Sequence, residues 1–471
     1  MTQAVRIKPG QHIHLVGIGG VGLSAIARVL IGRGFTVSGS DRAANTYTEA
    51  LSAEGVRVTI GHDAANIAGA DLIIVTSAAN AENPEIAAAR AAAIPVYKRS
   101  EIITDVISAG LDSPPFVIAV AGTHGKTTTT SMIAHMLITC GLKPGYIIGG
   151  TLSTTGTNGE AGGGDLFVIE ADEYDNMFHG IAYDLAVITS LEWDHPDFFP
   201  TFETMIESFR VFTMNAVNKD GCVIACGDDA GIPRLNAVID GDQVRWLSYG
   251  RGNALHVRDQ GGMTTFMLAD TSYEVRITRP GMHNVLNALG ALQAVFMLPL
   301  FGDFSTRFTL ENAVKALATY QGTGRRFEVM GTADGVTVID DYAHHPTAIR
   351  VTLEAARMRY PDHAVWAVWQ PHTFSRTRTL WADYLASFGA ADHVIVTDIY
   401  AAREAPDPGV TAERFAAELS GKHADARHIS GLDRAAAVLA DEAKMPAVIL
   451  IMSAGDAPQI GRQFLALRGV Q

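Results

Sequence analysis

This 471-residue sequence has few cysteines, no long apolar run and fewer basic than acidic residues. Only three cysteines occur, Cys140, Cys222 and Cys226, too few for a disulfide framework and typical of a reducing compartment. Cys222 and Cys226 lack a second cysteine pair to complete a structural zinc site, so we expect small buried side chains there. No apolar run reaches about 18 residues, so we expect no membrane span. The N-terminal residues lack a signal-peptide pattern, and we expect a cytoplasmic location.

Acidic side chains outnumber basic ones. With 50 Asp and Glu against 36 Lys and Arg, the net charge is −14. Nucleic-acid binding is therefore not expected, because it needs a cationic face. A small anionic ligand remains compatible, since backbone amides, one lysine and a metal ion can hold phosphate in a locally positive cleft.

Strand-like runs alternate with amphipathic helical runs along the whole chain. This alternation predicts an α/β protein with parallel sheets covered by helices. Punctuation by Pro114-Pro115 and by the segment 321–324 suggests three domains, residues 1–113, 114–321 and 322–471. We expect Rossmann-like N- and C-terminal domains around a central domain with a parallel or mixed sheet. Short alternating β runs are expected at about 243–277.

A glycine-rich turn follows the first predicted strand. Gly17, Gly19, Gly20 and Gly22 precede a predicted helix, and an acid ends the next strand about twenty residues on, the spacing of a dinucleotide-binding turn. The bound diphosphate could belong to NAD or to a UDP-sugar, and the acid could bind a ribose hydroxyl or cap a turn. The candidate substrate-binding residues are Gly19, Gly20, Val21, Gly22, Ser40 and Asp41.

A second loop, residues 121–127, joins a predicted strand to a helix and predicts a P-loop ATPase-like domain. Gly125-Lys126-Thr127 opens the helix, so that Lys126 would reach the β- and γ-phosphates and the Thr127 hydroxyl would bind Mg²⁺. The loop is a shortened variant, because Val120 stands where the general pattern has its first glycine and Gly122 follows two residues later.

Acidic residues follow two further predicted strands of the same domain. Glu170 is the first candidate for a metal ligand, with Asp172 or Glu173 next. His195, after the other strand, would bind a metal or orient a nucleophile. Each cluster alone is typical of a solvated loop, but carboxyl ends of parallel strands face the ligand crevice, which favours a metal site.

The order of these motifs resembles the Mur ligases over nearly the whole chain. The matching segments are residues 14–22, 38–41, 122–129, 170–173, 192–195, 280–284, 322–327, 340–346 and 370–377. The resemblance implies three domains that bind a UDP-sugar, ATP and an amino acid in that order.

The resemblance also implies roles for individual residues. Catalytic roles fall to Lys126, His195, His344 and Arg376, and metal binding to Thr127, Glu170 and His195. ATP would be bound by Gly122, Thr123, His124, Gly125, Lys126, Thr127, Thr128, His283, Asn284, Arg325 (or its neighbour Arg326) and Asp341, while His344 and Arg376 face the amino acid. Two positions depart from the family pattern: Thr373 stands where some members have Arg, and Tyr174 where relatives often have Ser.

The activity implied is that of a peptidoglycan-precursor ligase using ATP and Mg²⁺, with Mn²⁺ as a substitute. Within the family, the glycine turn and the 370–377 stretch favour addition of L-alanine to UDP-N-acetylmuramate over addition of a preformed tripeptide. An NAD-dependent oxidoreductase would explain the first turn but not Lys126 or Glu170. No nucleic-acid or membrane partner is expected, and a monomer and a homodimer both remain open.

Overall fold

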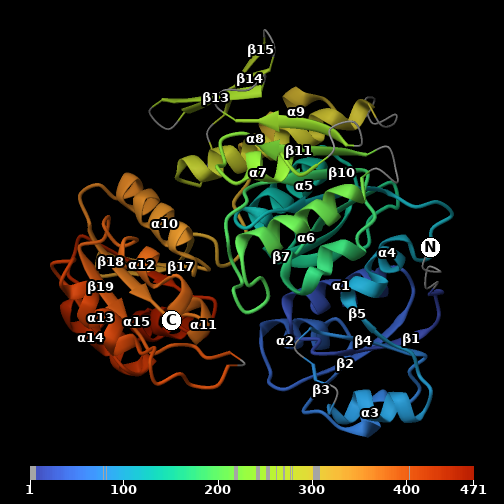
Figure 1. The fold of residues 1–471 in the computed structure, drawn as a ribbon, viewed down its shortest axis with the longest axis horizontal. Coiled ribbons are helices and arrows are strands. Elements are labelled where there is room, and N and C mark those ends of the chain that lie inside the picture. Colours follow the sequence, from blue (N-terminus) through green and yellow to red (C-terminus); the bar gives the residue numbers. More distant parts are fainter. Residues whose placement is uncertain are drawn as a thin grey trace. The chain divides into compact units, whose positions relative to one another are not determined.

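The computed structural model describes residues 7–77, 79–80, 82–216, 221–239, 244–250, 255–260, 263–268, 271–275, 277, 279–300, 308–402 and 404–470. The chain forms two compact units. The first comprises Met1–Glu192, Glu203–Ile277 and Leu286–Gln321, and the second Trp193–Phe202, Thr278–Val285 and Gly322–Gln471. Both units combine mainly parallel sheets with helices, which confirms the predicted α/β class (Figure 1).

The N-terminal part of the first unit is a five-stranded parallel sheet with the order β3-β2-β1-β4-β5. Its strands are β1 (His12–Val16), β2 (Thr36–Asp41), β3 (Arg57–Ile60), β4 (Leu72–Val75) and β5 (Val96–Lys98). The helices are α1 (Val21–Gly32), α2 (Thr46–Ala53), η1 (Ala64–Ile67), α3 (Pro84–Ala91) and α4 (Arg99–Ser108). Strand β4 is buried along its whole length, as expected for a parallel strand covered on both faces.

The first unit contains a second, seven-stranded sheet with the order β12-β11-β10-β6-β9-β7-β8. Its strands are β6 (Phe116–Ala121), β7 (Gly145–Leu152), β8 (Thr157–Glu160), β9 (Leu166–Glu170), β10 (Leu185–Ile188), β11 (Cys222–Cys226) and β12 (Arg245–Tyr249). Only the β7–β8 pair is antiparallel, so the sheet is mixed as predicted. Because β6 pairs in parallel with both β9 and β10, the loops that follow these three strands meet at one edge of the sheet.

Helices and a small sheet complete this part of the chain. They are α5 (Lys126–Thr139), η2 (Tyr174–Gly180), α6 (Phe202–Met214), α7 (Ile232–Asn236), α8 (Met282–Met297), η4 (Leu298–Leu300) and α9 (Leu310–Leu317). Strands β13 (Leu255–Gln260), β14 (Met263–Leu268) and β15 (Thr271–Val275) form an antiparallel sheet, where short alternating β runs were expected. Cys222 and Cys226 are free and buried, as predicted, and burial raises the pKa of each thiol to about 11.

The second unit is built on a six-stranded sheet with the order β16-β17-β21-β18-β19-β20. Its strands are β16 (Glu328–Ala333), β17 (Val336–Asp341), β18 (Ala364–Trp369), β19 (His393–Val396), β20 (Ala426–His428) and β21 (Ala447–Met452), and only β16 pairs antiparallel. The helices are α10 (Pro346–Arg359), α11 (Phe374–Thr379), α12 (Trp381–Leu385), α13 (Ala412–Ser420), α14 (Leu432–Glu442) and α15 (Pro458–Leu467).

Trp369 is the largest fully buried side chain of the second unit. Its ring lies 4.6 Å from that of Tyr384, 5.0 Å from Phe415 and 5.5 Å from Phe388, measured between ring centroids. Trp366, on the opposite face of β18, stacks on His393 at 4.0 Å. Both tryptophans are therefore core residues.

One helical stretch, Met282–Leu300, is long and apolar enough to cross a membrane by length and composition. In its most apolar window, 72% is buried inside the protein. Burial of this kind is typical of a core helix, and length and composition alone are weak support for a membrane span.

The central strand β21 should carry much of the stability of the second unit. Leu450→Ala removes a fully buried side chain from it and should lower the free energy of unfolding by about 2–5 kcal/mol. Tryptophan fluorescence suits the measurement, because four of the five tryptophans, Trp193, Trp366, Trp369 and Trp381, belong to this unit. The control Leu467→Ala, at a residue that is 61% exposed, should cost less than about 0.5 kcal/mol; equal effects of the two variants would refute the assignment.

Candidate functional site

The phosphate loop joins β6 to α5 and depends on two glycines with left-handed backbone conformations. Gly122 has φ +130° and Gly125 has φ +82°. A Cβ on Gly122 would overlap the hydroxyl of Thr189, and one on Gly125 would overlap the side chain of Asn287. Glycine is thus required at both places by conformation and by space.

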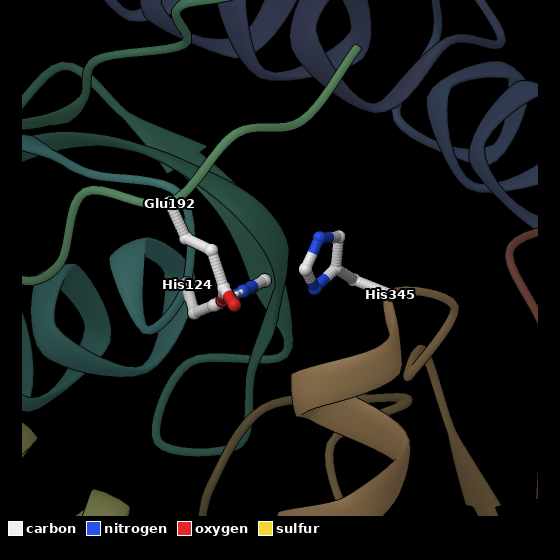
Figure 2. Close-up of side chains that lie close together, drawn as sticks. All are labelled: His124, Glu192 and His345. Atoms are coloured by element: carbon white, nitrogen blue, oxygen red, sulfur yellow. Dashed lines mark hydrogen bonds and ion pairs between the residues drawn. The ribbon is translucent and has the colours of Figure 1, made fainter. Parts of the chain in front are cut away.

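Residues that follow β10 brace this loop from the side. The Thr123 amide donates to Ser190 O at 3.0 Å, and the His124 amide donates to Ser190 Oγ at 2.9 Å. Figure 2 shows the side chains of His124 and Glu192, whose Nε2 and Oε2 atoms are 2.9 Å apart, together with His345, which precedes α10. The first amides of α5 have no intrahelical partner and remain suited to phosphate.

The Lys126 ammonium is bound by the carboxylate of Glu173, which follows strand β9. Its Nζ donates to both carboxylate oxygens of Glu173, at 2.9 and 2.6 Å, and to Gly122 O at 2.6 Å. The Glu173 side chain is only 1% exposed. Burial by itself would lower the pKa of Lys126, but the charges of Glu173, Asp172 and Glu170 outweigh it and raise the pKa, so the ammonium stays charged.

Thr127 and Glu170, two of the predicted metal ligands, lie together beside Lys126. The Thr127 hydroxyl donates to Glu170 Oε1 at 3.0 Å, and Glu170 Oε2 accepts from the Gly149 amide at 2.7 Å. A Cβ on Gly149 would come within 2.6 Å of the Glu170 carboxylate. A hydroxyl and a carboxylate next to a phosphate loop are hard oxygen ligands, so these residues fit Mg²⁺.

His195, the third predicted ligand, belongs to the second unit and lies against Arg376. The guanidinium of Arg376 contacts three groups: Asp194 Oδ1 at 2.9 Å, His195 Nδ1 at 3.1 Å and His372 Nδ1 at 3.0 Å. Because a guanidinium only donates, both ring nitrogens accept, and each neutral ring carries its proton on Nε2. His195 therefore fits a metal ion only after Arg376 releases its Nδ1 atom.

Charges within this cluster are tightly fixed. Burial by itself would raise the pKa of Asp194, but Arg376 and the neighbouring histidines lower it well below its ordinary value. Burial lowers the pKa of His372 to about 4, and Arg376 contributes to the shift. The pKa of His344 is lowered in the same way, and its Nδ1 lies 2.9 Å from Tyr342 O. The His344 ring therefore donates from Nδ1 and keeps its lone pair on Nε2.

Asp341 and Arg325, two further residues predicted to bind ATP, form hydrogen bonds within the second unit. Asp341 accepts from the amides of Phe327 and Ala343, at 2.7 and 2.8 Å. Arg325 donates to Ser453 O at 2.7 Å and to Asp340 at 3.2 Å. These contacts fix the carboxyl end of β17, and roles of Arg325 and Asp341 in ATP binding stay predictions.

Helix α8 supplies two predicted residues and one that was not predicted. Asn284 donates to Pro280 O at 2.7 Å and lies 3.1 Å from His283 Nε2, within the second unit. Asn287, one turn later and within the first unit, lies against Gly125 of the phosphate loop. Asn287 follows Asn284 by three residues, so both lie on one face of the helix. This spacing is the signal in the sequence from which Asn287 could have been predicted.

In the N-terminal turn, Asp41 braces the glycines. Its Oδ2 atom accepts from the Gly19 amide at 2.9 Å, which favours the turn-capping alternative for that oxygen. The Ser40 hydroxyl is buried and donates to Glu85 at 2.6 Å, so any effect of Ser40 on a ligand would be indirect. Gly20 is the N-cap of α1, and Val21 and Gly22 begin the helix, where amides have no intrahelical partner.

The structure adds features of the site that the sequence did not predict: strained backbone at three residues, and contacts of residues inside or beside the matching motifs. His195, Arg325 and Thr373 have positive φ values of 54°, 58° and 64° although they are not glycine, a feature that gathers at functional sites. Asp194 and His372 stood within the matching motifs without a role, and Glu173 was expected to bind a metal rather than Lys126.

Glu173→Gln should destabilise the nucleotide-free protein. Removing one partner of a buried ion pair leaves the Lys126 ammonium uncompensated, at a cost of about 3–5 kcal/mol. Bound MgADP would supply the missing negative charge, so the increase in Tm on adding MgADP should be larger for the variant than for wild type. The matched control is Glu192→Gln, which removes a carboxylate beside the loop that pairs with His124. If MgADP raised Tm equally in Glu173→Gln and wild type, the charge-compensation argument would fail.

The contribution of His372 to the stability of the second unit should fall as the pH is lowered from about 6.5 to about 4. His372 has its pKa lowered from 6.5 to about 4, so the unfolded chain binds the extra proton in this window. The stability is fully present above 6.5 and is lost toward pH 4, by at most about 1.4 kcal/mol per pH unit for this group. His372→Asn keeps an acceptor for Arg376 and should flatten the slope, measured by tryptophan fluorescence during denaturant unfolding. Identical slopes for variant and wild type would contradict the assignment.

Comparison with known proteins places the whole chain in one family. Three family models match in succession: the Mur ligase family catalytic domain over residues 12–110, the Mur ligase middle domain over residues 120–295, and the Mur ligase glutamate ligase domain over residues 325–455.

Individual relatives match over almost their full length. Proteins named UDP-N-acetylmuramate–L-alanine ligase share 38% identity in Geobacter sulfurreducens, over 97% of each chain, and 39% in a Roseiflexus species, over 96% of this chain and 97% of the relative. Among solved structures, the UDP-N-acetylmuramate–alanine ligase of Thermotoga maritima has a TM-score of 0.78 at 26% identity, covering 97% of this chain and 98% of that one. A murein peptide ligase of Psychrobacter arcticus has a TM-score of 0.72 at 25% identity, covering 98% and 99%. The resemblance predicted from the motifs is thereby confirmed, and the chain belongs to the Mur ligase family.

Proposed function

We propose that this protein is an ATP-dependent ligase that joins L-alanine to UDP-N-acetylmuramate in peptidoglycan precursor synthesis, forming ADP and phosphate. The observation that carries the proposal is the phosphate loop, where the Lys126 ammonium and the Thr127–Glu170 pair lie together. Full-length relatives with this activity in their names support the choice of substrates. A cytoplasmic location agrees with the use of ATP and a soluble nucleotide sugar.

The first step activates a carboxylate, which is a poor acyl donor. A lactyl carboxylate oxygen attacks the γ-phosphorus of ATP, the bond to the β-phosphate oxygen breaks, and an acyl phosphate and ADP result. Lys126 and the first amides of α5 hold the phosphate oxygens and spread their charge, since catalysis of phosphoryl transfer is mostly positioning and electrostatics. Mg²⁺ held by Thr127 and Glu170, with Mn²⁺ as a substitute, would neutralise further charge on these oxygens.

The second step forms the amide. The neutral α-amine of alanine attacks the acyl carbon, and phosphate leaves with the electrons of the C–O bond. A free α-amine has a pKa of about 8, so a neutral fraction exists at pH 7. The proton must leave the nitrogen once the new bond forms. His344 supports this role, because its pKa is lowered and its Nε2 lone pair is available.

Arg376 acts in this proposal mainly by positioning. Each nitrogen of its guanidinium has one partner, Asp194, His195 or His372, and only 4% of its side chain is exposed. Thr373, at the place where some family members have Arg, caps α11 by accepting from the Arg376 amide at 3.4 Å. Arg378 is 61% exposed and pairs with Asp407. Neither Thr373 nor Arg378 thus supplies a second arginine beside Arg376 for a clamp on the amino-acid carboxylate.

A tripeptide ligase of murein recycling is the second candidate. It is favoured by the fold similarity to the Psychrobacter arcticus enzyme, but the higher identity to alanine-adding relatives supports L-alanine. An NAD-dependent oxidoreductase would leave Lys126, Thr127 and Glu170 without a role.

Phosphate release measured with ATP, Mg²⁺ and UDP-N-acetylmuramate tests the proposal directly. L-alanine should give the highest kcat/KM among alanine, glycine, serine and the tripeptide. Lys126→Ala should lower kcat by about 100-fold or more, because a group that stabilises transition-state charge is lost. The matched control is Lys143→Ala, at an exposed lysine, which should retain wild-type turnover. Full turnover by Lys126→Ala, or phosphate release that needs the tripeptide, would overturn the proposal.

A further inference from the structure

Arg99, the first residue of α4, has a side chain that makes no hydrogen bond to any residue that the structure describes. Its side chain is only 15% exposed, and its Nε atom is buried without a partner among the described residues. Its ion-pair contact is with Asp172, at 3.7 Å, which is too long for a hydrogen bond. A buried guanidinium N–H without a partner is costly, so an anion that accepts from Arg99 would be bound favourably.

The guanidinium of Arg99 lies against the glycine-rich turn. A Cβ on Gly22 would overlap Arg99 Nη1. Gly22 is the second residue of α1, next to the helix amides that have no intrahelical partner. The absence of a side chain at Gly22 therefore makes room for the guanidinium, in addition to any role in helix packing. Two kinds of anion-binding donor, helix amides and an arginine, converge at one place.

We propose that Arg99 binds the diphosphate of the sugar nucleotide, together with the first turn of α1. The inference rests on the proposed function, because a UDP-sugar is the ligand assigned to this turn. A guanidinium matches phosphate oxygens with paired, charge-assisted hydrogen bonds. The lactyl carboxylate is the other anionic group of the same substrate, but Arg99 lies at the turn where the diphosphate would sit.

Arg99 also lies close to Asp172, and this places it beside a second loop. Asp172 follows β9 and stands two residues after Glu170. One guanidinium thus lies between the glycine turn and the acidic loop beside Lys126. Its contact with Asp172 is loose enough for the guanidinium to turn toward a diphosphate.

Isothermal titration of UDP into the full-length protein, with MgADP already saturating the ATP site, tests the assignment. Arg99→Met should weaken UDP binding by about tenfold or more, the loss expected for charge-assisted hydrogen bonds. Arg99→Lys should restore part of the affinity. The matched control Lys98→Ala removes the adjacent charge, which is 55% exposed and pairs with Asp175, and should change UDP affinity less than twofold. MgADP affinity should be unchanged in all variants.

Two readouts separate ligand binding from a structural role. Without ligand, Arg99→Met should unfold at an equal or higher temperature, because a buried N–H donor without a partner is removed; a structural arginine would give a lower Tm. UDP and UDP-N-acetylmuramate should lose affinity by the same factor, whereas loss confined to UDP-N-acetylmuramate would assign Arg99 to the carboxylate and overturn the inference. Wild-type affinity of Arg99→Met for UDP would overturn the inference alone, while failure of the wild-type protein to bind UDP would also refute the proposed function.

Discussion

A buried ammonium balanced by carboxylates is the constraint on which the phosphate loop depends. Lys126 lies among Glu170, Asp172 and Glu173 in a protein that carries a net charge of −14. A polyanion entering such a site needs every available positive group, and Lys126 can serve only if it stays charged while buried. Glu173 maintains that charge without a ligand, and phosphate oxygens can replace the carboxylate when a nucleotide binds. In the proposed function, nucleotide binding would be an exchange of anions around one fixed cation.

The second unit uses a related arrangement with arginine in place of lysine. Arg376 is buried against Asp194 and donates to His195 and His372. The guanidinium donates to one ring nitrogen of each histidine and so fixes both tautomers, and burial lowers the pKa of His372. Arg99 is the contrasting case, because its neighbour Asp172 does not satisfy its donors. Of these three cations, Arg99 is therefore the one whose carboxylate contact is longer than a hydrogen bond, so an anion can bind to it without breaking one.

Local spacing allowed the strand–loop–helix motifs, the α/β class and the Thr127–Glu170 pair to be predicted, because carboxyl ends of neighbouring parallel strands converge at one sheet edge. The partners of the buried cations were not predictable in this way. Arg99 and Gly22 are 77 positions apart, and Asp194 and Arg376 are 182 apart, so only the folded chain reveals these contacts. Asp41 shows the same limit: the spacing left two roles open, and its hydrogen bond to Gly19 supports one of them.

The structure of the protein with MgADP bound, compared with its nucleotide-free crystal structure, tests the exchange at Lys126 most directly. The quantity to measure is the distance from Lys126 Nζ to Glu173 and to the β-phosphate. Our account predicts that Nζ lies about 3 Å from a β-phosphate oxygen in the complex and that its bidentate contact with Glu173 is broken or shared. MgADP bound away from Gly125, with Lys126 still held by both oxygens of Glu173, would contradict it.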